Sequence, residues 1–223
     1  MSYYPVLLEL ENKNVLIVGG GKVAQRKVET LLECGALLSI VSKGLTANLK
    51  ALIETRRVHF LSDEFNDKHL DNIFLVVAAT NDKQLNHRVS ESAKKRGLLI
   101  NAVDQPPDCN FIVPSIIKKG DLLIAISTSG KSPALAKRLR EEIETQFGNE
   151  YKTFLVMMGH LRKIILSKKF SQEENNRIFF EIVNSDILKA LKKGDWEVVK
   201  MSLRRILPSD LIRNNFFDDI KPS

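Results

Sequence analysis

The sequence predicts an α/β protein: a Rossmann-type parallel sheet, then a small α+β region, then a C-terminal helical domain. Three observations predict this class. A glycine-rich turn joins a strand-like run to a helix-like run near the N-terminus. Strand-like and helix-like runs then alternate up to about residue 113, which is typical of a parallel sheet covered by helices. From residue 149 the apolar residues recur at helical spacing among many Lys and Arg residues. The predicted boundaries are therefore 1–113, 114–148 and 149–223.

The first region opens with a βαβ unit. Residues 14–18 are an aliphatic strand-like run, residues 22–34 have helical periodicity, and residues 37–41 form a second strand after the helix-ending Gly35. The alternation then continues along the chain. We expect a helix over 45–54, a strand over 58–61, a strand over 73–78, a helix over 83–96 and a strand over 98–103.

The other two regions have a different character. Strand-like runs at 111–113, 115–118 and 122–127 are short, and the Lys119–Gly120–Asp121 turn favours a hairpin between the last two. Ser132 and Pro133 are typical of a helix start, so we expect a helix from there to residue 147. The third region predicts helices over 149–166, 172–183, 186–192 and 196–206.

The glycine-rich turn has the Gly-x-Gly-x-x-Gly/Ala pattern of a dinucleotide site, with Gly19, Gly21 and Ala24 at the three positions. Gly19 allows the tight turn, Gly21 lets the backbone approach a pyrophosphate, and Ala24 lets helix and strand pack closely. The N–H groups at the helix start, with its dipole, are suited to hold phosphates. An ordinary glycine turn is the weaker alternative. The predicted cofactor residues here are Gly19, Gly20, Gly21, Lys22, Val23 and Ala24.

Other polar residues follow the predicted strands, where ligands of parallel sheets bind. Ser42 and Lys43 stand where an acidic residue usually contacts the ribose, so they can bind a ribose or tolerate a 2′-phosphate. The choice between NAD and NADP is therefore open at this point. Thr80 and Asn81, which precede Asp82, are further predicted cofactor residues.

The composition limits the classes of partner. The chain has 223 residues, a formal charge of +7, 43% hydrophobic and 27% charged residues, which indicates a globular protein that favours anionic partners. The Lys and Arg residues are interpreted mainly as solvated helix faces, and the Phe residues as core, so we expect no nucleic-acid partner. We also expect no signal peptide and no membrane partner. Two cysteines favour a reducing cytoplasm.

Several chemistries lack their motifs. The sequence has no Tyr-x-x-x-Lys pair, no Gly-x-Ser-x-Gly elbow and no Walker lysine loop. Its four histidines have no zinc-site spacing, so no metal site is predicted. Asp104 follows a strand near the place of a nicotinamide ring, where a carboxylate can accept a proton as hydride leaves. The alternative, that Asp104 only starts the turn at Pro106, is equally good. Cys109 is interpreted as a packing residue rather than a nucleophile.

Five motifs in order make the resemblance specific. They are GGGKVAQRK (19–27), AATND (78–82), NAVD (101–104), CNFIVPS (109–115) and ISTSGKSP (126–133). The chain resembles the precorrin-2 dehydrogenase/sirohydrochlorin ferrochelatase family, which is also the N-terminal module of siroheme synthase. The likeness covers residues 1 to about 150, and the helical tail matches only in length and layout.

The resemblance implies NAD-dependent oxidation of precorrin-2 to sirohydrochlorin in siroheme biosynthesis, by a homodimer whose middle region supplies the dimer contacts. It implies that Asp104 is the catalytic group, and that bifunctional members also insert Fe²⁺ as a substrate. Residues matching Thr128 and Ser129 line the tetrapyrrole cleft. Lys131 is a candidate to meet substrate carboxylates, as is Arg138, for which solvent exposure is equally good. The predicted substrate residues are Asn101, Asn110, Thr128, Ser129 and Lys131.

Three questions stay open at the level of sequence. Nothing decides whether ferrochelatase activity is present. A non-catalytic nucleotide-sensing regulatory module of the potassium-uptake type shares the glycine-rich βαβ unit, although it does not need the segments at 109–115 and 126–133. A structural or nucleic-acid-associated basic protein is the third possibility, and it would bind polyanions in a salt-dependent way without turnover.

Overall fold

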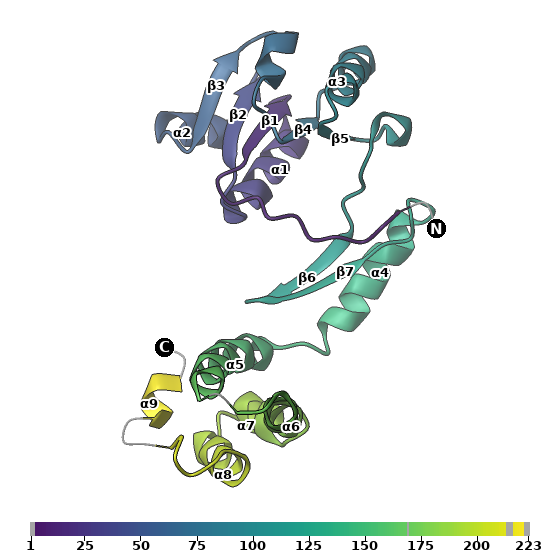
Figure 1. Cartoon of the computed structure of the whole chain (residues 1–223). Coiled ribbons are helices and arrows are strands. Elements are labelled where there is room, and N and C mark those ends of the chain that lie inside the picture. Colours follow the sequence, from purple (N-terminus) through teal and green to yellow (C-terminus); the bar gives the residue numbers. More distant parts are fainter. Residues whose placement is uncertain (1–2, 169, 213–215, 221–223) are drawn as a thin grey trace. The chain divides into compact units, whose positions relative to one another are not determined.

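The computed structural model describes residues 3–168, 170–212 and 216–220. The chain folds into two compact units, residues 1–113 and 114–223 (Figure 1). Each unit is considered by itself below. A further division of the second unit at residue 149 stays a prediction.

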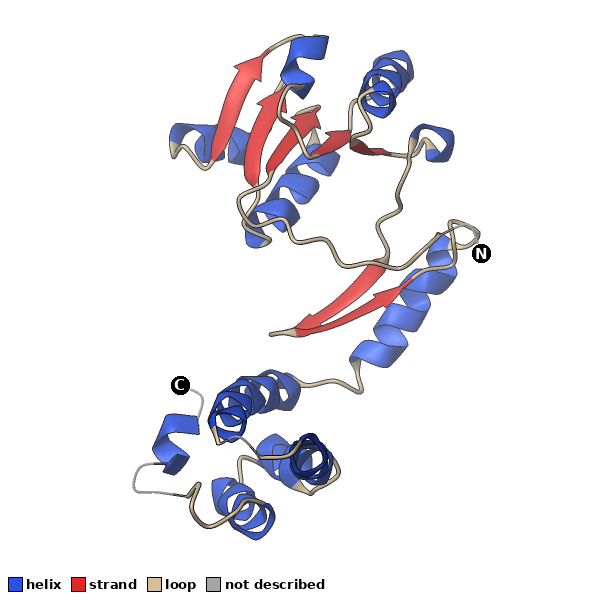
Figure 2. Cartoon of the chain, viewed as in Figure 1, coloured by secondary structure: helices blue, strands red, loops and turns tan. Residues whose placement is uncertain are grey.

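The described residues of the first unit form a five-stranded parallel sheet, seen as red arrows in Figure 2. The strands are β1 (Asn14–Val18), β2 (Leu37–Val41), β3 (Val58–Ser62), β4 (Leu75–Ala78) and β5 (Leu99–Ala102). Their order in the sheet is β3-β2-β1-β4-β5. The predicted Rossmann-type α/β class is thus confirmed, and the strand order reverses between β1 and β4, where such sheets bind ligands.

Helices cover both faces of this sheet, because successive residues of each strand point to opposite sides. Val15 and Ile17 of β1 face a core shared with α1 (Lys22–Glu33) and α2 (Ala47–Glu54). Leu16 and Val18 face a second core with α3 (Lys83–Lys95) and the short 3₁₀ helix η1 (Asp67–Leu70). All four β1 side chains are almost completely buried, which explains why the strand reads as an unbroken aliphatic run.

The strand register brings three strand ends level at one edge. Val18 of β1 pairs with Val41 of β2 on one side and with Ala78 of β4 on the other. The N–H of Gly19 continues this ladder by donating to the carbonyl of Val41 at 2.9 Å. The glycine turn and the segments that follow β2 and β4 therefore leave the sheet side by side.

Two sequence predictions in this unit need correction. The strand expected at 111–113 is wrong, because Phe111 uses its carbonyl to accept from the side chain of Asn101 at 3.3 Å instead of joining a ladder. The helix expected from residue 45 begins at Ala47, because the Thr46 hydroxyl accepts from the N–H of Leu49 and caps it. A short 3₁₀ helix, η2 (Pro106–Asp108), was not predicted.

The second unit begins with the predicted hairpin. Strands β6 (Ser115–Lys119) and β7 (Leu122–Ile126) pair antiparallel, and Gly120 adopts a φ of +62° in the turn. Helix α4 (Pro133–Glu144) contacts the hairpin, but it ends at Thr145, short of the expected residue 147. The core of the hairpin is Ile117, which is almost completely buried.

The remaining helices share one apolar core. In the described part of the chain these are α5 (Asn149–Ser167), α6 (Gln172–Val183), α7 (Ile187–Lys193), α8 (Trp196–Ile206) and α9 (Phe216–Ile220), of which α9 was not predicted. Gly194 ends α7 in the left-handed conformation and Asp195 caps α8 through the N–H of Val198. No described helix has the length and apolar character that crossing a membrane requires.

Candidate cofactor and catalytic site

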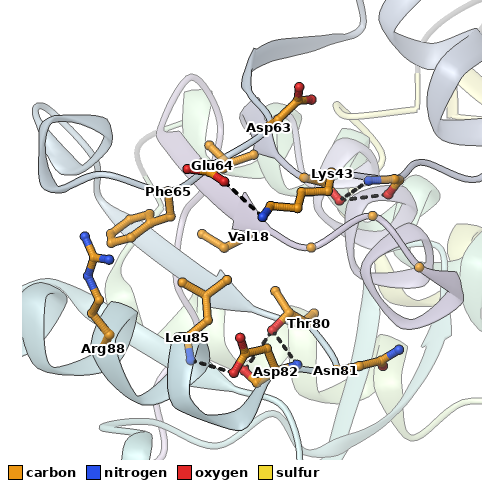
Figure 3. Close-up of a pocket in the computed structure, with 17 residues that line it drawn as sticks. Val18, Lys43, Asp63, Glu64, Phe65, Thr80, Asn81, Asp82, Leu85 and Arg88 are labelled. Atoms are coloured by element: carbon orange, nitrogen blue, oxygen red, sulfur yellow. Dashed lines mark hydrogen bonds and ion pairs between the residues drawn. The ribbon is translucent and has the colours of Figure 1, made fainter.

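A pocket of about 560 Å³ lies at the carboxyl ends of β1 to β4 (Figure 3). The first turn of α3 closes one side of it. The lining consists of Val18, Gly19, Gly20, Gly21, Val41, Ser42, Lys43, Gly44, Asp63, Glu64, Phe65, Ala79, Thr80, Asn81, Asp82, Leu85 and Arg88. The pocket therefore occupies the place that a parallel sheet offers a nucleotide.

The three glycines of the turn have different tasks. A Cβ atom on Gly19 would collide with the carbonyl of Ala79, and Gly19 also has a φ of +122°. A Cβ atom on Gly20 would collide with the carbonyl of Gly44 in the segment after β2. A Cβ atom on Gly21 would meet nothing within 4 Å. Since the protein itself fills the space beside the first two glycines, only Gly21 leaves room for a ligand.

The start of α1 faces this open space with its own N–H groups. Among the described residues, no side chain caps the helix at Gly21, and the first turn carries no acidic residue. Lys22 and Val23 belong to this first turn rather than to the pocket lining, and Ala24 is completely buried against the sheet. An uncapped helix start beside a glycine with no Cβ fits the pyrophosphate of a dinucleotide.

Acidic side chains surround the predicted ribose position. The Ser42 hydroxyl donates to the carbonyl of Gly44 at 2.8 Å, and the Lys43 ammonium lies 2.9 Å from a carboxylate oxygen of Glu64. The hydrogen bond and the charge of Glu64 raise the pKa of Lys43, with smaller effects from Asp63 and Asp82. Lys43 is thus neutralised within the pocket, as Figure 3 shows.

The sequence analysis missed Asp63 and Glu64, although they directly follow a predicted strand and that position was the available signal. It also missed the apolar end of the pocket. Phe65 is buried there, and the guanidinium of Arg88 lies 5.7 Å from the centre of its ring. Leu85 of α3 completes this end, whose flat apolar and cationic surfaces suit an adenine ring.

The segment after β4 is organised by α3. The N–H and the hydroxyl of Thr80 both donate to Oδ1 of Asn86, at 3.2 and 2.7 Å. Asp82 caps α3 by accepting from the N–H groups of Gln84 and Leu85. Asn81 is exposed in the lining. The predicted pair Thr80 and Asn81 therefore lies at the pocket, with Thr80 held in place from below.

Asp104 lies at the end of β5, in a turn closed by the N–H of Gln105 donating to the carbonyl of Ala102 at 3.2 Å. Its φ of +59° at the third position is the pattern of a type II turn, which favours Gly or Asn there. The side chain of Asp104 is exposed and, within the described residues, has no hydrogen-bond or ion-pair partner. A free carboxylate on a left-handed backbone is typical of a functional position.

The residues around this turn have structural tasks. The Asn110 side chain donates to the carbonyl of Leu98 and accepts from the N–H of Ile100, both at 2.8 Å, so it extends the edge of β5. The Cys109 thiol accepts from the N–H of Ala102 at 3.2 Å. Burial raises the pKa of Cys109, which agrees with a packing residue rather than a nucleophile. The substrate contacts of Asn101 and Asn110 stay predictions.

The other predicted substrate residues belong to the second unit, in the loop between β7 and α4. Thr128 braces this loop by donating to the carbonyl of Ser132 and accepting from its N–H. Ser129, with a φ of +53°, and Lys131 are exposed. Arg138 is bound to Glu142 at 2.7 Å on the outside of α4, which favours its interpretation as a solvated residue.

The comparisons with known proteins agree with this geometry. A family model described as "Putative NAD(P)-binding" matches residues 6–115, and one described as "Sirohaem biosynthesis protein central" matches residues 119–146. The chain is 36% identical to a siroheme synthase of Photorhabdus laumondii and 37% identical to one of Mannheimia succiniciproducens. These alignments cover 95% and 94% of this chain but 45% and 44% of the relatives. The chain thus spans less than half the length of these curated relatives.

A solved structure titled "SirC, precorrin-2 dehydrogenase" superposes with a TM-score of 0.76 at 27% identity, covering 91% of this chain and all of that one. This match includes both units, which the glycine turn alone does not require. The chain belongs to the siroheme synthase and precorrin-2 dehydrogenase family. The first unit is accordingly its NAD-binding domain. Among the described residues of this family member, no group of three or more His, Cys, Asp or Glu side chains is arranged to hold a metal ion.

Proposed function

We propose that the protein is an NAD-dependent dehydrogenase that oxidises precorrin-2 to sirohydrochlorin. One observation carries this proposal: a dinucleotide cradle and an unpartnered carboxylate lie on either side of the strand-order reversal. The pocket covers the ends of β3, β2, β1 and β4, and Asp104 follows β5 beyond them. Since the described pocket accounts for the adenosine and phosphate half, the nicotinamide half extends toward Asp104. The names of the relatives and of the superposed structure supply the substrate.

The residues have separate tasks in this reaction. Gly21 and the first turn of α1 hold the pyrophosphate, and the segments after β2 and β3 hold the adenosine. Bound NAD⁺ supplies the acceptor for the hydride. Oxidation of the macrocycle removes one hydride and one proton, so the two electrons leave with the hydride and a base takes the proton. Asp104 is that base, because its carboxylate is exposed and free.

The substrate is a polycarboxylate, and the second unit offers groups to bind it. We assign Thr128, Ser129 and Lys131 to this task, together with Asn101 and Asn110 of the first unit. Lys131 is exposed and has a positive charge. The hydroxyls and the left-handed backbone of the loop suit carboxylate recognition.

The homodimer is part of the same proposal. Ile116 and Leu123, each 40% exposed, lie on the hairpin face opposite buried Ile117. A two-stranded hairpin with an exposed apolar face is marginally stable alone, and pairing with a second copy would cover it. Fe²⁺ is a substrate if the protein is bifunctional. Cys34 and Cys109 are free, which supports a cytoplasmic location.

The decisive experiment is NADH formation from NAD⁺ and enzymatically prepared precorrin-2. Turnover is expected with the intact chain. Its absence beside a working control enzyme would refute the dehydrogenase and favour the nucleotide-sensing module, which binds NAD without consuming it. Adding Fe²⁺ to sirohydrochlorin and following absorbance against an enzyme-free blank tests chelation on the same preparation.

A further inference from the structure

An unusual set of polar side chains lies on the inner face of α3. Asn86 is 1% exposed and Ser90 is fully buried, four residues apart on the face that packs against the sheet. Buried polar groups are costly unless their hydrogen bonds are satisfied. Asn86 uses both ends of its amide: Oδ1 accepts twice from Thr80, and Nδ2 donates to the carbonyl of Thr80 and to Oε1 of Gln105, each at 3.0 Å. Its function is therefore to join two loops.

Gln105 carries this connection to a second buried residue. Its Nε2 donates to Oδ2 of Asp108 at 2.9 Å and to the carbonyl of Lys83 at 3.2 Å. Asp108, which is 7% exposed, is held from the other side by His87, whose Nδ1 lies 2.7 Å from Oδ1. The Ser90 hydroxyl donates to the carbonyl of Asp108 at 2.6 Å. Both ends of the Gln105 amide are thus fixed by α3.

We propose that Gln105 is the positioning residue for Asp104, and that the chain of hydrogen bonds Thr80–Asn86–Gln105–Asp108 fixes the catalytic turn relative to the cofactor pocket. Gln105 is adjacent to Asp104, and its N–H closes the turn in which Asp104 has its left-handed backbone. Thr80, at the other end, lines the pocket. The inference rests on the proposed function, in which Asp104 is the base.

A purely structural role predicts something different. If Gln105 only stabilised the fold, its loss would reduce the amount of active enzyme equally, whatever residue occupied position 104. If Gln105 acts through Asp104, its loss matters only while the carboxylate is present. The two cases are separated by a double-mutant cycle, because coupled residues give non-additive effects.

The test compares Gln105→Ala, Asp104→Asn and the double variant of the full chain, with Gln84→Ala as the matched control for an exposed glutamine at the start of α3. We expect Gln105→Ala to lower kcat by about tenfold to a hundredfold, because small misplacements of a catalytic group have effects of that size. The KM for NAD⁺ should not change. In the Asp104→Asn background, Gln105→Ala should cause no further loss. Equal losses in both backgrounds, or a wild-type kcat for Gln105→Ala, would overturn the inference.

A rescue experiment tests the same bond directly. Gln105→Glu places two carboxylates opposite each other, whereas combining it with Asp108→Asn restores a hydrogen bond of reversed direction. We expect the pair to recover part of kcat, and a pair as slow as Gln105→Glu alone would contradict the proposal. Hydrogen exchange at the Gln105 N–H gives a readout without turnover. It should become faster in Gln105→Ala; unchanged exchange refutes the positioning role, whereas a wild type without turnover refutes only the proposed function.

Discussion

The conformation of Asp104 decides how its catalytic role should be tested. With a φ of +59°, the position suits Asp, Asn or Gly, whereas Ala in the left-handed region costs about 1–2 kcal/mol. Asp104→Ala therefore combines two effects, loss of the carboxylate and backbone strain. Asp104→Asn removes the negative charge and keeps a side chain that tolerates this backbone, so it isolates the chemistry.

The expected magnitude follows from the task of the group. Removing a general base lowers rates by about 10²- to 10⁴-fold, which corresponds to roughly 2.7–5.4 kcal/mol of activation free energy. The stability of Asp104→Asn should change by less than about 0.5 kcal/mol, because the side chain has no partner within the described residues. Asp104→Ala should in addition lose about 1 kcal/mol of stability.

The assay measures kcat for NADH formation, NAD⁺ affinity by titration and the free energy of unfolding by urea denaturation. Asp121→Asn, the same chemical change at the exposed turn of the hairpin, is the control. We expect the affinity for NAD⁺ to be unchanged in Asp104→Asn. A kcat within threefold of wild type would refute the assignment of Asp104 as base. Loss of NAD⁺ binding in this variant would instead show that the residue contacts the cofactor.

Three further predictions follow from the pocket and the catalytic turn. Gly21→Ala should fold normally, because its Cβ atom meets nothing, yet bind NAD⁺ at least about tenfold more weakly; equal affinity, with Gly159→Ala as control, would remove Gly21 from the phosphate site. Glu64→Gln frees Lys43, so the affinity for NADP⁺ relative to NAD⁺ should rise roughly two- to fivefold in low salt, and an unchanged ratio, judged against Glu91→Gln, would contradict this. Because burial raises the pKa of Cys109, the folded state prefers its protonated thiol; stability should fall as pH rises above the ordinary thiol pKa, and Cys109→Ala should flatten this fall in urea titrations at increasing pH.

Local sequence signals were sufficient for the framework of the first unit. The aliphatic run before the glycine turn, the helical spacing after it and the repeated alternation depend on neighbours a few residues apart, so they can be interpreted without a fold. The roles of Gly19 and Ala24 followed from the same local pattern, and the structure agrees with both. The expected strand at 111–113 failed because distant amides, of Asn101 and Asn110, occupy the backbone groups of that region and of β5.

The sequence by itself determined that a nucleotide meets the ends of β1, β2 and β4, and which family the chain resembles. Only the tertiary structure decided that Glu64 neutralises Lys43 and that Phe65 and Arg88 form the apolar end of the pocket. It also decided that Asn86 and Gln105 connect this pocket to the turn of Asp104. The physical reason is range. Periodicity and turn chemistry are fixed by adjacent residues, whereas these contacts join residues from different strands and helices, which come together only when the parallel strands align in register.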